Sequence, residues 1–157
     1  PARAQTPAEP SPISWMSFEK AIETNAKTKK NKKKIFIDVY TTWCGWCVKM
    51  DNSTFKDPAI VQVMNKYFLP VKFNAEQKDS VVYNGTTYRN TGRTHELAVT
   101  LLKGQLGYPA FVILDTDGKT ITTVKGYRDA SEFIHILRYY GEDIYLTQSW
   151  EDYRNSR

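Results

Sequence analysis

The feature that most constrains this chain is an apolar strand followed directly by its only two cysteines. The run Ile35-Phe36-Ile37-Asp38-Val39-Tyr40 is apolar apart from one carboxylate, and Trp43-Cys44-Gly45-Trp46-Cys47 comes after it. A Cys-x-x-Cys pair behind a strand is typical of a redox-active dithiol. A disulfide across so short a loop restricts the unfolded chain little and adds little stability. The spacing therefore favours a pair that is oxidised and reduced over a structural staple.

Length and composition indicate one globular domain. The 157 residues, 41% of them hydrophobic and 13% aromatic, suffice for an ordinary core. The net charge of +5 is concentrated in a basic run before the strand, formed by Lys27, Lys29, Lys30, Lys32, Lys33 and Lys34. Such a run can attract nucleic acid or anionic lipid. Because no aromatic residues alternate with these lysines to stack on bases, we interpret the run as a solvated turn and expect no nucleic-acid partner.

The two ends of the chain differ from its middle. Residues 1–13 are rich in proline and small residues, which predicts a flexible linker before a domain over 14–141. A start at Pro1 is what a removed signal peptide or lipid-anchor segment would leave, although a trimmed chain would begin the same way. We therefore expect an exported protein, periplasmic or membrane-anchored through a removed segment. No stretch approaches the about 18 apolar residues of a membrane span.

Hydrophobic periodicity predicts alternating helices and strands. The expected helices cover 14–27, 44–55, 57–64, 94–102 and 129–140, the strands cover 35–40, 68–73, 110–114 and 120–124, and a hairpin covers 81–88. Thr94 is the expected cap of the fourth helix, and Asp129 with Glu132 forms an expected capping pair at the last. The aromatic residues of the extension 142–157 predict a short packed helix. Two strands joined through helices, followed by a hairpin, imply a mixed sheet covered on both faces.

In combination these features resemble the thioredoxin superfamily, and most closely its exported bacterial thioredoxin-like proteins. The shared features are Asp38 six residues before Cys44, the Trp-Cys-Gly-x-Cys motif, Lys72 before Phe73-Asn74, and Tyr108-Pro109 leading into a strand. The resemblance covers roughly residues 34–127. It implies an α/β, thioredoxin-like fold whose mixed central sheet has helices on both faces. It also implies thiol–disulfide exchange with proteins that contain cysteines or disulfides, and no cofactor.

The chemistry of the pair follows from its place at a helix start. Backbone N–H groups and the helix dipole stabilise a thiolate there, so we expect Cys44 to be the exposed nucleophile and Cys47 the buried, resolving partner. The resemblance places Asp38 beneath the pair as a proton acceptor acting through water, with Lys72 near it. Burial should raise the pKa of Asp38. The alternatives are a surface-facing Asp38 on an edge strand and a Lys72 that is a plain strand-end charge.

The remaining candidates concern substrate binding. The resemblance implies a cis bond before Pro109 and an extended substrate that pairs with the backbone at Tyr108. Trp43 and Trp46 flank the nucleophile and could form an apolar platform for polypeptide, although Trp43 is equally well explained as a core residue.

Two tyrosines and two histidines complete the list of candidates. Tyr83 and Tyr88 could extend the platform or simply pack their own hairpin. His95 and His135, the only histidines, lie far from the cysteines in sequence, so we expect no metal site.

Two departures limit what the resemblance implies. Gly45-Trp46 stands between the cysteines where thioredoxin has Gly-Pro, so the redox direction stays open, with a reductase favoured. Residues 77–93 form a longer connection than thioredoxin has, an inserted segment that could change substrate recognition. The rival interpretations are a non-catalytic binding or chaperone-like module and a dithiol redox sensor. We expect a monomer that depends on an upstream thiol–disulfide electron-transfer partner.

Overall fold

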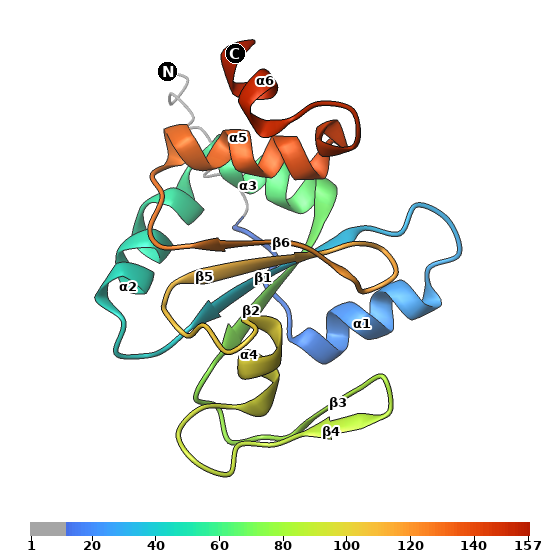
Figure 1. The fold of residues 1–157 in the computed structure, drawn as a ribbon, viewed down its shortest axis with the longest axis vertical. Coiled ribbons are helices and arrows are strands. Elements are labelled where there is room, and N and C mark those ends of the chain that lie inside the picture. Colours follow the sequence, from blue (N-terminus) through green and yellow to red (C-terminus); the bar gives the residue numbers. More distant parts are fainter. Residues whose placement is uncertain (1–11) are drawn as a thin grey trace, which may run out of the picture.

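The computed structural model describes residues 12–157, and its centre is a four-stranded mixed sheet with the order β2-β1-β5-β6 (Figure 1). The strands are β1 Lys34–Tyr40, β2 Phe68–Asn74, β5 Ala110–Leu114 and β6 Thr120–Lys125. β1 and β2 are parallel, β5 is antiparallel to β1, and β6 is antiparallel to β5. The predicted mixed sheet is confirmed.

Helices cover both faces of this sheet (Figure 1). One face is covered by α1 (Phe18–Lys27), α4 (Glu96–Leu101) and the hairpin of β3 (Val81–Tyr83) and β4 (Thr86–Tyr88). The other is covered by α2 (Gly45–Asn52), α3 (Pro58–Tyr67) and α5 (Ala130–Gly141), with α6 (Trp150–Asn155) packed outside α5. Short 3-10 turns follow α2 at Thr54–Lys56 and α5 at Ile144–Leu146.

Strand alternation divides the core into two parts. Ile35, Ile37 and Val39 of β1 face α1 and α4, whereas Phe36 faces α2, α3 and α5. Because side chains alternate along a strand, Asp38 shares the face of Phe36.

Four strand ends meet at one edge of the sheet. Tyr40 is paired with Asn74, Val39 with Ala110, and Ala110 with Lys125. The loops after β1, after β2, before β5 and after β6 therefore lie together. The basic run lies at the opposite end of β1, where Asn31 turns the chain with a left-handed φ of 61°.

The first helix begins later than its periodicity predicts. Ser17 caps it by accepting a hydrogen bond from the N–H of Lys20 at 3.1 Å. The preceding backbone pairs with β2 instead, because Met16 forms a bridge with Val71. Ile13, which the sequence analysis assigned to the linker, is buried. Of the predicted linker, residues 1–11 lie outside the described part of the chain.

The cap of α4 is also not the predicted one. His95, not Thr94, caps this helix, because its Nδ1 accepts a hydrogen bond from the N–H of Leu97 at 3.1 Å. The ring is fully buried, and its Nε2 lies 3.0 Å from the carbonyl oxygen of Asp79. Both ring nitrogens are thus engaged in holding the chain together.

Of three other local predictions, the hairpin turn is confirmed, the capping pair of α5 is half formed, and the end of α2 is wrong by three residues. The turn Asn84-Gly85 of the hairpin has positive φ angles of 52° and 76°, as the sequence predicts. Asp129 caps α5 through the N–H of Glu132, but the carboxylate of Glu132 lies 3.3 Å from Arg128 and does not complete the pair. The helix after the cysteines ends at Asn52, short of the predicted residue 55.

No helix among residues 12–157 has the length and apolar content needed to cross a membrane.

Candidate functional site

The cysteine pair occupies the first turn of α2. Cys44 and Cys47 form a disulfide, and the sulfur of Cys44 also caps the helix by accepting a hydrogen bond from the N–H of Cys47 at 3.1 Å. The expected contrast in exposure is not found, since Cys44 is 5% and Cys47 3% exposed. The bond to Cys47 and the capping contact both hold the Cys44 sulfur against the helix, which accounts for its burial.

Asp38 lies in the interior, on the sheet face that α2 covers. β1 is a central strand with β2 and β5 on either side, so the alternative of an edge-strand Asp38 is wrong. Burial raises the pKa of Asp38 to about 6, against the opposing effect of Lys72. Its Oδ1 has no hydrogen-bond partner among the described residues. This oxygen is therefore available to take up a proton.

Lys72 bridges two carboxylates. Its Nζ lies 2.7 Å from Oδ2 of Asp38 and 2.6 Å from Oδ1 of Asp51. It also sits over aromatic rings, 4.7 Å from the centre of Tyr40 and 5.2 Å from that of Trp15. Burial alone would lower the pKa of Lys72, but the two carboxylates outweigh it and raise the pKa. Lys72 is thus a fixed internal cation, not a plain strand-end charge.

Asp51 is a site residue that the sequence analysis did not identify. It lies on α2 four residues after Cys47, and residues four apart share a helix face. Through Lys72 it connects this face of α2 to Asp38 beneath it. The spacing from Cys47 could have pointed to Asp51, but its partner Lys72 comes from β2.

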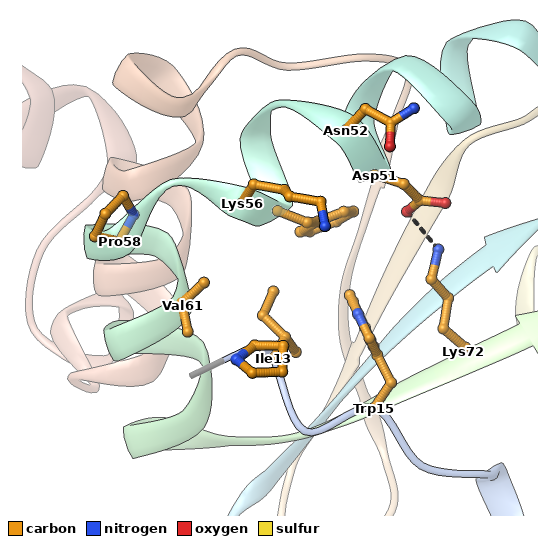
Figure 2. A pocket seen from close by; sticks show the side chains of 10 residues that line it. Ile13, Trp15, Asp51, Asn52, Lys56, Pro58, Val61 and Lys72 are labelled. Carbon is orange, nitrogen blue, oxygen red and sulfur yellow. Dashed lines mark hydrogen bonds and ion pairs between the residues drawn. The ribbon is translucent and has the colours of Figure 1, made fainter. Parts of the chain in front are cut away.

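The ion pair between Lys72 and Asp51 lines a cavity of about 780 Å³ (Figure 2). The pair lies at one end of the cavity, and Pro58 and Val61 of α3 lie at the other. Neither cysteine belongs to the lining. The cavity therefore lies beside the charged groups next to Asp38, and the disulfide is not part of its lining.

The exposed surface next to the disulfide, formed by Trp43, Trp46 and the residues packed on each of them, is called the mouth below. Trp43 and its contacts form one wall of it. Trp43 is 60% exposed, so its interpretation as a core residue is wrong. Its Nε1 donates to Oε1 of Glu76 at 2.8 Å, and the other oxygen of Glu76 accepts from Nε of Arg93 at 2.8 Å. The guanidinium of Arg93 lies 5.5 Å from the Trp43 ring centre, and Tyr108 packs edge-on at 6.0 Å. The hydrogen bonds from Arg93 and Trp43 lower the pKa of Glu76.

Trp46 forms a second wall and is 57% exposed. Its ring packs on Tyr127 at 5.3 Å, and the ammonium of Lys49 lies 5.0 Å from the Trp46 centre and 4.9 Å from that of Tyr127. The sequence analysis did not identify Lys49 or Tyr127, nor Glu76 or Arg93 on the first wall. Only the three-residue spacing of Trp46 and Lys49 was visible in sequence.

Tyr108 and Pro109 directly precede β5, and Tyr108 packs against the wall formed by Trp43. The peptide bond between them is cis, Pro109 is buried, and its carbonyl accepts from the N–H of Gly126 at 2.8 Å. The hairpin tyrosines do not join this platform. Tyr83 packs on Phe18 of α1 at 5.0 Å and Tyr88 packs against the same core, so both side chains hold the hairpin to the domain core instead of packing within the hairpin alone.

Residues 12–157 contain no group of three or more His, Cys, Asp or Glu side chains arranged to hold a metal ion. His135 packs against Tyr153 of α6 at 6.3 Å.

A model of the thioredoxin-like domain matches residues 22–141 of this chain. The chain belongs to the thioredoxin-like family. Among curated proteins, an uncharacterised protein of Caenorhabditis elegans is 28% identical over 111 residues, covering 71% of this chain and 14% of that protein. The thiol:disulfide interchange protein DsbD of Pectobacterium atrosepticum is 27% identical over 116 residues, covering 71% of this chain and 17% of DsbD. The chain thus spans less than a fifth of either relative.

Solved structures share the fold at low identity. The DsbH oxidoreductase superposes with a TM-score of 0.60 at 18% identity, covering 89% of this chain and 92% of DsbH. The oxidised C-terminal domain of Neisseria meningitidis DsbD superposes with a TM-score of 0.51 at 20% identity, covering 78% of this chain and 96% of the domain. The α/β, thioredoxin-like fold expected from sequence is confirmed.

Proposed function

We propose that this protein is a thiol–disulfide oxidoreductase that exchanges disulfides with protein substrates. The observation that carries the proposal is the Cys44–Cys47 disulfide at the N-terminus of α2, on the sheet face that holds the buried Asp38. The family and the interchange activity named for DsbD support it.

In the reducing direction the reaction begins at Cys44. Its thiolate attacks one sulfur of a substrate disulfide, so that a Cys44–substrate bond forms and the other substrate sulfur leaves as a thiolate. Cys47 then gives up its proton, and its sulfur attacks that of Cys44. The Cys44–Cys47 disulfide forms and the second substrate sulfur leaves. Two electrons pass to the substrate, whose thiolates take up two protons, and an upstream dithiol protein restores the reduced pair.

The buried carboxylate suits the second attack. A general base works best when its pKa lies near the operating pH. With a pKa of about 6, Asp38 is mostly ionised at neutral pH and can accept the proton of Cys47. Lys72 holds one Asp38 oxygen, which leaves Oδ1 for that proton. Trp43, Trp46, Tyr108 and Pro109 would form the surface that receives the substrate chain.

Replacing each cysteine tests the proposal. Cys44→Ser should lower dithiol-driven reduction of insulin by more than about 10³-fold, because the attacking thiolate is lost. Cys47→Ala should instead accumulate a mixed disulfide between Cys44 and substrate, visible by mass spectrometry. A Cys44→Ser protein that still reduces insulin would contradict the assignment. If the unaltered protein shows no turnover and Cys44→Ala binds the partner with full affinity, the interpretation as a binding module would be favoured.

Direction and location are finer parts of the proposal. We propose a reductase, for which the reduction potential should lie near the about −270 mV of thioredoxin; about −120 to −180 mV would indicate an oxidant or isomerase. Fluorescence of Trp43 and Trp46 in dithiothreitol buffers would report it. We also propose that the protein works outside the cytoplasm, in the periplasm or at a membrane. Cell fractionation tests this location.

A further inference from the structure

Two cations stand at the mouth of the dithiol, one on each tryptophan. Arg93 lies over Trp43 and Lys49 lies over Trp46. Attraction between a cation and the face of an aromatic ring holds such a charge in place. Arg93 is further fixed by its bond to Glu76, while its side chain remains 75% exposed. Both positive charges are therefore positioned at the mouth and reachable from solvent.

The charge at this edge of the sheet is unbalanced in favour of cations. Glu76 is engaged through both oxygens, by Trp43 and Arg93. Lys49 forms no ion pair within the part of the chain that the structure describes. The Nζ of Lys125, at the end of β6, donates to the neutral Gln105 at 2.9 Å and forms no ion pair with residues 12–157. The positive charge without an acidic partner therefore comes from Lys49 and Lys125, whereas Arg93 is paired with Glu76 through Nε and presents the rest of its exposed guanidinium to an approaching molecule.

A hollow beside Trp43 offers room for a side chain. Its volume is about 360 Å³, and it is lined by Trp43, Glu76, Arg93, Thr94, Leu106, Gly107 and Tyr108. Most of this lining comes from the loops after β2 and before β5, which meet at the dithiol edge. Arg93 belongs to the inserted segment 77–93, so this segment contributes directly to the mouth. A planar guanidinium suits a carboxylate, which it can bind through two parallel hydrogen bonds.

We propose that the protein partner carries acidic side chains next to its reacting cysteine, and that Arg93 and Lys49 recognise them on the two sides of the dithiol. This inference rests on the proposed oxidoreductase function and names its substrate class. Charges of one sign around a reactive cleft raise the rate of encounter with the opposite charge by about 10- to 10³-fold. They also disfavour partners of like charge.

The test uses single-cysteine peptides as symmetrical disulfides, with Glu, Gln or Lys on both sides of the cysteine. Each disulfide reacts with the reduced protein to give two peptide thiols and the Cys44–Cys47 disulfide, followed by tryptophan fluorescence. Flanking charge also changes the pKa of the leaving thiol, so each rate is divided by the rate of the same peptide with dithiothreitol.

The normalised rate should be about tenfold higher for the Glu peptide than for the Lys peptide at low ionic strength. In about 1 M salt this ratio should approach one, because screening then acts within about 3 Å.

The double variant Lys49→Gln/Arg93→Gln should reduce the Glu-to-Lys ratio to about twofold. The ratio for Lys49→Gln alone should lie between that value and the ratio of the unaltered protein. Arg93→Lys keeps the charge and should keep most of the ratio. Lys29→Gln, in the basic run at the far end of β1, is the matched control and should keep all of it.

Three results would overturn the inference. The first is a ratio of one in the unaltered protein, and the second is a ratio that the double variant leaves unchanged. The third is a charge effect seen with glutathione disulfide but absent with the peptides, which would mean a small acidic disulfide and not a polypeptide. Failure of the oxidoreductase proposal looks different, since no peptide and no insulin would then be reduced.

Discussion

The region beneath the disulfide and the region around it differ in burial and in the elements that hold them. Beneath it, Asp38 and Lys72 form a buried ion pair whose position is fixed by β1 and β2. Around it, Trp43 and Trp46 are exposed and held by contacts from loops. The buried pair can change the proton chemistry without meeting the partner. In the proposed function the exposed walls would meet the partner without touching the proton path, so the two regions would divide the work between chemistry and recognition.

The largest effect should come from the buried region. Asp38→Asn removes the proton acceptor and should slow the resolving step about 100-fold at neutral pH. In the unaltered protein this step should also slow as pH falls through about 6, where Asp38 becomes protonated, and the variant should lose that dependence. Stopped-flow measurement of mixed-disulfide decay checks both. Asp143→Asn, an acid paired with Lys34 outside the site, is the control and should behave like the parent.

The same substitution should stabilise the fold at neutral pH. The pKa of Asp38 is about 6 in the folded chain, against about 3.9 when unfolded. The folded state thus binds more protons between these values, and its stability falls as pH rises through them. Asp38→Asn removes this cost and should raise the free energy of unfolding by about 3 kcal/mol at pH 7. Urea unfolding of the oxidised proteins measures it, and equal stability at pH 7 would argue against the buried carboxylate.

A smaller effect should come from the wall around Trp43. Glu76→Gln replaces the charged acceptor that both Trp43 and Arg93 use. The indole should become more mobile, and exchange with the Gln peptide should slow about twofold, in line with about 0.5 kcal/mol for an exposed hydrogen bond. Fluorescence anisotropy and peptide kinetics report these changes. If Trp43 is equally rigid in the variant, the contact with Glu76 does not hold this wall.

The buried region was more predictable from sequence than the mouth. Asp38 is an isolated carboxylate in an apolar strand, and that contrast alone indicates a special environment. The cysteines and Asp129, which caps α5, are recognised from spacing of a few residues. Features that depend only on such short spacing can be predicted without knowledge of the fold.

The contacts of the mouth join residues far apart in the chain. Glu76 and Arg93 reach Trp43 only because the strands bring their loops to one edge of the sheet. The first helix was misplaced for a similar reason, since pairing of Met16 with Val71 overrides the helical periodicity. The burial of Cys44 was not predicted, because the spacing identifies the cysteine pair but not the side chains that cover it.

The most direct test of this division of work measures exchange with the Glu and Lys peptides between about pH 5 and 9 in two variants. Asp38→Asn should change the pH dependence of the resolving step and leave the Glu-to-Lys ratio as in the parent. Lys49→Gln/Arg93→Gln should lower the ratio and leave the pH dependence near 6 in place. If either variant changes both quantities, the buried pair and the mouth are coupled and the account is contradicted.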